Sequence, residues 1–419
     1  MKIGIVATSV WRSPHLEMAK ALVRRGHQVA VYTEDARVPT SARFTRLQED
    51  GVEIIAIHNE RRNPWLWLPD KLLKPLLGRR FMTTLYAIYR YIRETRCDVY
   101  AIEGDWLGVF PALLSYLMPF RWVVTVHDHE LLGVKLDYPG EPSSWWREPV
   151  KRWVLRRTDG VRANSWVTRD VLVRGGISPE TITVVPLHYT DRMCIEGDLD
   201  VFRDESRRDI LQRHGLPDDC ELLVAACRLT PFKGLDLALR AIAIAHRERA
   251  RIRLIICGGD RIVEGVGSYR AFLERIATES GILASVVFAG NIPPGDVKRY
   301  YAAADLHLVP SYIDTFNYSA VEAALTGTRT VMTDLVGCGY WLGKIGAALI
   351  VEGRDPERFA SAIAQGLRLG PGPAGPLGVA TRTREELGLA RTAGEFEAML
   401  VHNLRRAQAS QVAAGRDGN

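Results

Sequence analysis

The chain has 419 residues, with 55 Lys and Arg against 49 Asp and Glu, which gives a formal net charge of +6. Its hydrophobic share of 47% and charged share of 25% exclude disordered and fibrous classes and are typical of folded globular proteins. A chain of this length exceeds one ordinary core and predicts two domains with a cleft between them. The positive charges are scattered, so a phosphorylated ligand or an anionic membrane surface explains them and no nucleic acid is required.

The chain also lacks the usual signals for export or membrane insertion. Its six cysteines are widely spaced without a CxxC pair, as is typical of reduced thiols in a cytosol. The N-terminus runs directly into an apolar strand pattern, without the regions of a secretion signal. The longest uncharged run, residues 106–120, is 15 residues long, short of the roughly 20 that span a bilayer. We therefore expect a cytoplasmic protein without a transmembrane helix.

The first half of the chain alternates short strands with helical patterns. The strands are nearly all apolar, as in a parallel sheet that is covered on both faces. Strands are predicted at residues 2–8, 27–33, 97–102, 121–128, 160–165 and 181–187, and helices at residues 14–25, 106–117 and 166–176. This alternation predicts a Rossmann-like domain.

A second alternation begins at Leu222, after an irregular polar stretch between His188 and Leu216 that we interpret as the passage between domains. Its strands are predicted at residues 222–227, 251–259, 285–290, 305–311 and 328–334, and its helices at residues 235–246, 269–280, 296–303 and 319–325. The predicted fold class is thus α/β, with two Rossmann-like, doubly wound parallel-sheet domains that face a central cleft. The predicted divisions are an N-terminal domain (1–190), a linker (191–216), a second domain (217–382), and a C-terminal helix with a frayed tail (383–419).

Two cations lie in the loop that follows the first strand of the second domain. Arg228 and Lys233, in the stretch CRLTPFKG, are five residues apart and precede a helix. Two positive charges beside a helix N-terminus can neutralise a diphosphate. An ordinary solvated loop with two charges explains the pattern equally well.

Two carboxylates follow a later strand of the same domain. Asp314 lies in the loop before a helix and Glu322 on that helix, so both can face the cleft and accept hydrogen bonds from a sugar or a ribose. The alternative is an acidic helix start, where Asp is favoured in any protein.

A histidine and several glycines complete the candidate site. His127 ends an N-domain strand, where it can donate to a hydroxyl or stabilise a leaving group, although a lone histidine is often structural. The run HDHE at residues 127–130 is a poor metal site, because adjacent residues of a strand point to opposite faces. The glycines of IICGGD (Gly258, Gly259) and of DLVGCGY (Gly337, Gly339) would let backbone NH groups approach a phosphate or a sugar.

The order and spacing of these residues resemble the retaining GT-B glycosyltransferases of glycosyltransferase family 4. The matching positions are Arg228, Lys233, Gly258, Asp314, Glu322 and Gly327, and the resemblance extends to residues 163–187 and 345–363. It implies a metal-independent enzyme without a cofactor, which moves a sugar from a nucleotide-sugar donor to a hydroxyl acceptor, either lipid-linked or a small molecule, with retention of configuration. The alternatives are a nucleotide-sugar epimerase or phosphorylase of the same fold, and a binding protein.

The resemblance also implies roles for single residues. Arg228 and Lys233 would hold the donor pyrophosphate, Glu322 the ribose and Asp314 the transferring sugar. His127 would contact a sugar hydroxyl or the reaction centre. Donor contacts are further expected from Gly258, Phe316 and Asn317, and acceptor contacts from Trp11, Arg12 and His127.

Two positions depart from the family pattern in the donor site. Asp314 stands where the family usually has Glu, and Asn317 replaces the usual Gly beside Phe316. The first loop also lacks the paired glycines that are common there. We therefore expect unusual contacts to the donor sugar.

Residues 61–80, RRNPWLWLPDKLLKPLLGRR, combine tryptophans and leucines with six cations. This composition suits a segment that lies in an anionic membrane interface, at the inner face of the membrane. An acceptor loop that packs its tryptophans on the N-domain is the alternative.

Overall fold

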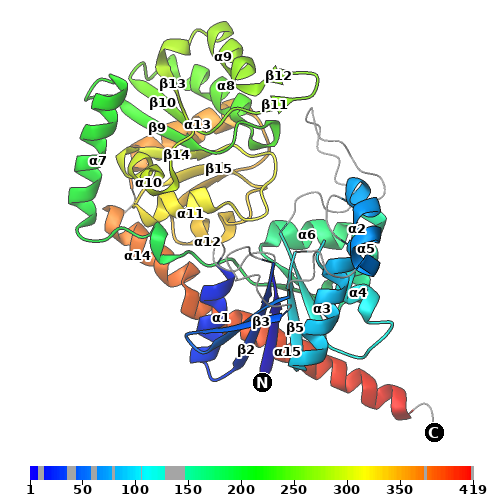
Figure 1. Ribbon diagram of the computed structural model, residues 1–419. Coiled ribbons are helices and arrows are strands. Elements are labelled where there is room, and N and C mark those ends of the chain that lie inside the picture. The colour runs from blue at the N-terminus through cyan, green and yellow to red at the C-terminus, as the bar shows by residue number, and fades with distance from the viewer. Residues whose placement is uncertain are drawn as a thin grey trace.

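A computed structural model of the chain describes residues 1–7, 14–34, 44–57, 64–77, 81–104, 106–127, 147–371 and 375–416. These residues form two α/β domains, each built on one large sheet (Figure 1). The two doubly wound sheets that the sequence predicts are confirmed.

The first sheet has eight strands in the order β3-β4-β2-β1-β5-β6-β7-β8. All neighbours are parallel except β3 and β4, which form an antiparallel edge. The strands are β1 (Lys2–Val6), β2 (Gln28–Thr33), β3 (Phe44–Glu49), β4 (Val52–Ile57), β5 (Val99–Glu103), β6 (Trp122–Val126), β7 (Gly160–Ala163) and β8 (Ile182–Val184). The helices of this half are α1 (His15–Arg24), α2 (Pro64–Leu77), α3 (Phe81–Thr95), α4 (Val109–Leu114), α5 (Arg147–Arg157) and α6 (Trp166–Arg174).

The second sheet has six parallel strands in the order β13-β10-β9-β14-β15-β16. They are β9 (Glu221–Ala226), β10 (Ile252–Cys257), β13 (Val286–Gly290), β14 (Leu306–Val309), β15 (Thr330–Thr333) and β16 (Ala348–Val351), and β11 (Ile262–Val263) pairs with β12 (Gly267–Ser268) in a separate hairpin. The helices are α7 (Leu199–His214), α8 (Leu235–His246), α9 (Tyr269–Glu279), α10 (Pro294–Ala303), α11 (Tyr318–Leu325), α12 (Gly339–Lys344), α13 (Pro356–Leu369), α14 (Gly375–Leu387) and α15 (Leu389–Arg416).

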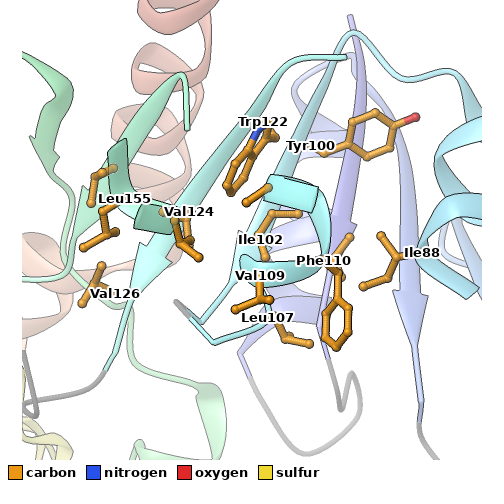
Figure 2. Close-up of a cluster of buried hydrophobic side chains, with 14 of the residues drawn as sticks. Ile88, Tyr100, Ile102, Leu107, Val109, Phe110, Trp122, Val124, Val126 and Leu155 are labelled. Carbon is orange, nitrogen blue, oxygen red and sulfur yellow. The ribbon is translucent and has the colours of Figure 1, made fainter. Parts of the chain in front are cut away.

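Each sheet carries an apolar core on both faces, because crossover helices cover both sides of a parallel sheet. In the first domain, α3, α4 and α5 pack on one face, where Ile88, Phe110, Trp122 and Leu155 are fully or almost fully buried (Figure 2). The other face packs against α1 and α15. These cores fix the strands, and through them the loops at the strand ends.

The segment predicted as an irregular linker is largely a helix, so that part of the prediction is wrong. Helix α7 begins after Asp198, whose carboxylate accepts hydrogen bonds from the backbone NH of Asp200 and Val201, and it ends at Gly215 in the left-handed region. It packs on α10 along the outer side of the second domain (Figure 1). Its buried side includes Ser206, and Arg203 and Arg207 donate to backbone carbonyls of that domain. A polar contact side of this kind hides the apolar period of 3.6 residues that marks a helix in a sequence.

The C-terminal helices tie the two domains together. Helix α14 packs on α11 of the second domain, and α15 runs back to the first domain, where it packs on α1 (Figure 1). Phe396 and Met399 of α15 belong to the core of the first domain. None of the helices in the described residues is long and apolar enough to cross a membrane.

Candidate active site

Each sheet has one point where the strand order reverses, between β1 and β5 in the first domain and between β9 and β14 in the second. At such a point the loops from neighbouring strands leave in opposite directions and open a crevice at the carboxyl ends of the strands. Glu103 ends β5, Arg228 follows β9 and Asp314 follows β14. The candidate site residues therefore lie where this fold places its ligands.

Lys233 is held beside the second crevice by a tight turn. It ends the short 3-10 helix Pro231–Lys233, and the next residue, Gly234, has φ +66°. A Cβ atom at Gly234 would lie 1.9 Å from the carbonyl oxygen of Pro310, so only glycine fits there. Lys233 Nζ donates to Asp314 Oδ2 at 2.5 Å. Arg228 is exposed, and it makes no salt bridge within the part of the chain that the structure describes.

Asp314 is fixed by its backbone and by a second donor. Its NH donates to the Leu335 carbonyl (2.9 Å), and its own carbonyl accepts from Gly337 (2.8 Å). Asn317 Nδ2 donates to Asp314 Oδ2 at 2.8 Å, while Asn317 Oδ1 caps α11 by accepting from the Ala320 NH at 2.9 Å. Asn317 has φ +77°, a left-handed conformation that Asn tolerates better than most residues. Asn317 thus combines the backbone shape of a glycine with a side chain that holds the carboxylate.

His127 approaches these groups from the first domain. It follows β6 directly, and with Arg228, Lys233 and Asp314 it lines a cavity of about 390 Å³. Thr315 Oγ1 donates to the backbone carbonyl of His127 at 3.0 Å, which is a direct contact between the two domains. The structure thus brings the two predicted cations, the first carboxylate and the histidine together in one cavity.

Of the other residues predicted for the donor site, some line this cavity and some lie elsewhere. Phe316 and Asn317 line the same cavity, although Phe316 is 2% exposed and packs against Trp341. Gly258 lies against the strand end, because a Cβ there would be 1.8 Å from the Cys227 carbonyl oxygen.

Glu322 is half-buried on α11 and is not among the described residues that line this cavity. Burial raises the pKa of Glu322, while a hydrogen bond from Tyr301 lowers it. The predicted acceptor residues Trp11 and Arg12 lie outside the described residues.

Sequence reasoning missed a buried carboxylate beneath His127. Glu103 has a side chain that is 4% exposed, and His127 Nε2 lies 3.0 Å from its Oε2. Arg162 and Asn164, from β7 and the residue after it, are also buried near the site. The available signal for Glu103 was its position as the last residue of an apolar strand, at the edge where the other candidates lie.

Three groups near His127 have the chemistry of metal ligands. His15, Glu103 and His127 each offer one ligand atom, and these atoms lie within 4.8 Å of one another. The buried guanidinium of Arg162 faces the same carboxylate, with Nη1 3.9 Å from Glu103 Oε1. A fixed positive charge at this distance repels a divalent cation, so the cluster suits an internal ion pair better than a metal site.

Two family models match the chain in its two halves. Residues 15–188 match a glycosyl transferase 4-like domain, and residues 206–373 match the glycosyl transferases group 1. The two matched ranges contain His127 in the first half, and Arg228, Lys233, Asp314 and Glu322 in the second.

Similar proteins and structures agree with these matches. A D-inositol 3-phosphate glycosyltransferase of Corynebacterium glutamicum is 25% identical over 358 residues, which are 83% of this chain and 81% of that protein. Its Mycobacterium tuberculosis counterpart is 35% identical over 201 residues, 47% of this chain and 41% of that protein. The sucrose-phosphate synthase of Thermosynechococcus elongatus superposes with a TM-score of 0.64 at 19% identity, over 99% of both chains. HepE of Anabaena in complex with UDP superposes with a TM-score of 0.66 at 16% identity, over 96% of this chain and 100% of that one. The chain is therefore a glycosyltransferase of the group 1 family, with the GT-B fold.

Proposed function

We propose that this protein transfers a sugar from a nucleoside diphosphate donor to a hydroxyl acceptor, with retention of the anomeric configuration and without a metal ion. The observation that carries the proposal is the cavity that Arg228, Lys233, Asp314 and His127 line together. Two cations suit a pyrophosphate, and a carboxylate with a histidine suits a hydroxyl-rich sugar.

The proposed reaction forms one bond and breaks one. The acceptor oxygen attacks the anomeric carbon, while the bond from that carbon to the phosphate oxygen breaks. The departing phosphate oxygen takes the acceptor proton on the same face, which retains the configuration. Lys233 and Arg228 neutralise the charge that develops on this oxygen, so they act most strongly in the transition state.

A donor screen tests the function directly. UDP-, GDP- and ADP-sugars are incubated with the protein, with and without acceptors, and release of the nucleoside diphosphate is measured. The acceptors include D-inositol 3-phosphate, which is named in the relatives, and lipid-linked hydroxyls. We expect release that depends on an acceptor and persists in EDTA, and a product whose NMR anomeric coupling matches that of the donor. Conversion of the donor without any acceptor would favour an epimerase or hydrolase instead.

We further propose that α2 contacts an anionic membrane at the cytoplasmic face, where a lipid-linked acceptor would be found. Trp65, Leu68 and Leu72 are exposed by 86%, 54% and 73%, and their spacing places them on one side of the helix. The only acid of residues 61–80, Asp70, is 3% exposed and accepts hydrogen bonds from the backbone NH groups of Met82 (2.6 Å) and Thr83 (3.0 Å). Among the described side chains, Lys71 is exposed beside this apolar side and no acid is exposed there. The sequence of residues 61–80 contains five further cations, a composition that favours binding at an anionic interface.

Vesicle co-sedimentation tests the membrane contact. The protein should pellet with phosphatidylglycerol vesicles at low salt, less so at high salt, and not with phosphatidylcholine vesicles alone. Leu72→Glu should release it. Ile262→Glu is the matched control, because Ile262 is 81% exposed on the second domain. Equal pelleting of the two variants would refute the assignment of α2.

A further inference from the structure

The buried carboxylate of Glu103 lies within hydrogen-bond distance of His127, the histidine of the candidate site. Glu103 is the last residue of β5 and pairs in register with Thr125 of β6, two residues before His127. This register brings the two side chains together, with 3.0 Å between Glu103 Oε2 and His127 Nε2. The carboxylate is 4% exposed, whereas the His127 side chain is 33% exposed and lines the cavity between the domains.

The surroundings of Glu103 keep it ionised. Burial by itself would raise its pKa, but the hydrogen bond with His127, the charge of Arg162 and, once it is protonated, the charge of His15 outweigh burial and hold the pKa well below its usual range. His15 is itself buried and its own pKa is lowered, so it is neutral at pH 7. The groups that keep Glu103 charged at neutral pH are therefore Arg162, whose Nη1 lies 3.9 Å away, and His127.

An ionised carboxylate can only accept hydrogen bonds. Nε2 of His127 must then carry the proton, and in a neutral ring Nδ1 carries none. Nδ1 has no hydrogen-bond partner among the residues that the structure describes, so it is the nitrogen left for a ligand. The backbone of His127 is held separately, because its carbonyl accepts from Thr315 Oγ1 at 3.0 Å.

We infer that Glu103 is a positioning residue, which holds His127 in the tautomer protonated at Nε2 so that Nδ1 accepts a hydrogen bond from a substrate hydroxyl. This inference rests on the proposed transferase function for the identity of the substrate. It narrows the role of His127, because a nitrogen that accepts a hydrogen bond selects a hydroxyl group and does not stabilise a departing phosphate. Donor sugars or acceptors that lack this hydroxyl would lose the contact.

The tautomer can be measured in the free protein, independently of any activity. The full chain, with its ten histidines labelled with ¹⁵N, is studied by NMR at pH 7.5 in EDTA, and the His127 signals are assigned by their loss in His127→Gln. We expect the neutral ring protonated at Nε2. A ring protonated at Nδ1, or at both nitrogens, would overturn the inference. Glu103→Gln should shift the His127 signals, whereas Glu53→Gln, a strand carboxylate of the same sheet that pairs with Arg46, should leave them unchanged.

Kinetics then test whether the arrangement serves transfer. Glu103→Gln should lower kcat/KM for transfer by about tenfold to a hundredfold, as expected when a charged hydrogen bond is lost. UDP affinity, measured by calorimetry, should stay unchanged, because the pyrophosphate cations are untouched. In a His127→Gln background the same change should have no further effect, since a residue that acts through His127 is not additive with it. An equal loss of transfer in both backgrounds, or a matching loss of UDP affinity, would show a general structural role instead.

The two hypotheses fail differently. If the wild-type protein neither binds UDP, GDP or ADP nor transfers any sugar, the proposed function fails, while the NMR experiment still decides the state of His127. If transfer is observed and His127 is protonated at Nδ1, the proposed function is supported and the proposed role of Glu103 is refuted.

Discussion

Lys233 and Asp314 form the central pair of the candidate site. Their hydrogen bond joins the group proposed for the pyrophosphate to the group proposed for the sugar, with Asn317 holding the same carboxylate oxygen. Glu322 is set apart, since it is half-buried on α11. This separation predicts different kinetic effects for the three side chains.

Lys233→Ala should lower kcat by roughly 100-fold or more, because it removes a preorganised positive charge from the departing phosphate. Steady-state kinetics measure this effect.

Asp314→Asn should lower kcat/KM for transfer yet leave affinity for the free nucleoside diphosphate nearly intact. Glu322→Gln should act mainly on donor KM, as expected for uniform binding of a ribose. Loss of nucleotide binding in Asp314→Asn but not in Glu322→Gln would reverse the two assignments.

Two buried histidines predict that the protein loses stability in mild acid. Burial lowers the pKa of both His188 and His307 to about 3, against 6.5 for an exposed histidine. Between these values the unfolded chain binds protons that the folded chain does not, so stability falls as the pH drops below about 6.5. Each histidine contributes a slope of up to about 1.4 kcal/mol per pH unit.

Urea unfolding at pH 7.5, 6 and 5 measures this slope. His307→Gln should flatten it, whereas His402→Gln, at an exposed position on α15, should not. Equal slopes in the wild-type protein and His307→Gln would show that other groups govern the acid sensitivity.

At the scale of elements, α7 shows how a polar helix becomes part of a domain. Asp198 caps its first turn, and Arg203 Nη1 donates to the Thr326 carbonyl at 2.8 Å and to Thr328 Oγ1 at 2.7 Å. The first of these bonds satisfies the carbonyl of Thr326, the residue that follows α11. The connection that leads from the first domain into the second is therefore shorter than the predicted linker, and it lies before Asp198.

Asp198→Ala should destabilise the second domain by about 1 kcal/mol, because two backbone NH groups at the start of α7 lose their acceptor. Urea unfolding followed by circular dichroism measures the change. Glu205→Ala, an exposed acid of the same helix, is the control and should change stability by less than about 0.5 kcal/mol. If the folded variant lost as much helical ellipticity as the whole of α7 contributes, the cap would be necessary for the helix and the arginine contacts would not be sufficient for it.

At the scale of the whole molecule, the site exists only where the two domains meet. His127 comes from the first domain and the cations from the second, and the contact between Thr315 and His127 is reinforced by Tyr318, whose hydroxyl donates to the His188 carbonyl at 3.3 Å. We predict that the two domains close on the donor by movement about the two connections between them, before α7 and between α14 and α15, and that closure excludes water from the donor.

We expect UDP to favour the closed arrangement and to lower the radius of gyration measured by small-angle scattering. Lys233→Ala should show a weaker response, because the bound pyrophosphate loses one of its cations. Calorimetry on the same samples shows whether UDP is bound. An unchanged radius with UDP bound would argue that the domains are already closed without a ligand.

The sequence by itself was sufficient for the fold class, and six of the residues that it proposes for the site line one cavity. Apolar strands that alternate with helices require parallel sheets, and the cations and carboxylates stand at strand ends where such sheets bind ligands. The polar contact side of α7 gave no apolar period, so that helix was missed.

The tertiary structure alone decided which of these residues meet. Lys233 and Asp314 are 81 residues apart in the chain, and His127 and Thr315 are 188 apart, so only the packing of two sheets brings them together. The same holds for Glu103, which looks like an ordinary strand end until the register of β5 with β6 places it under His127. Local patterns specify elements, whereas the state of an ionisable group depends on charges and burial that long-range contacts supply.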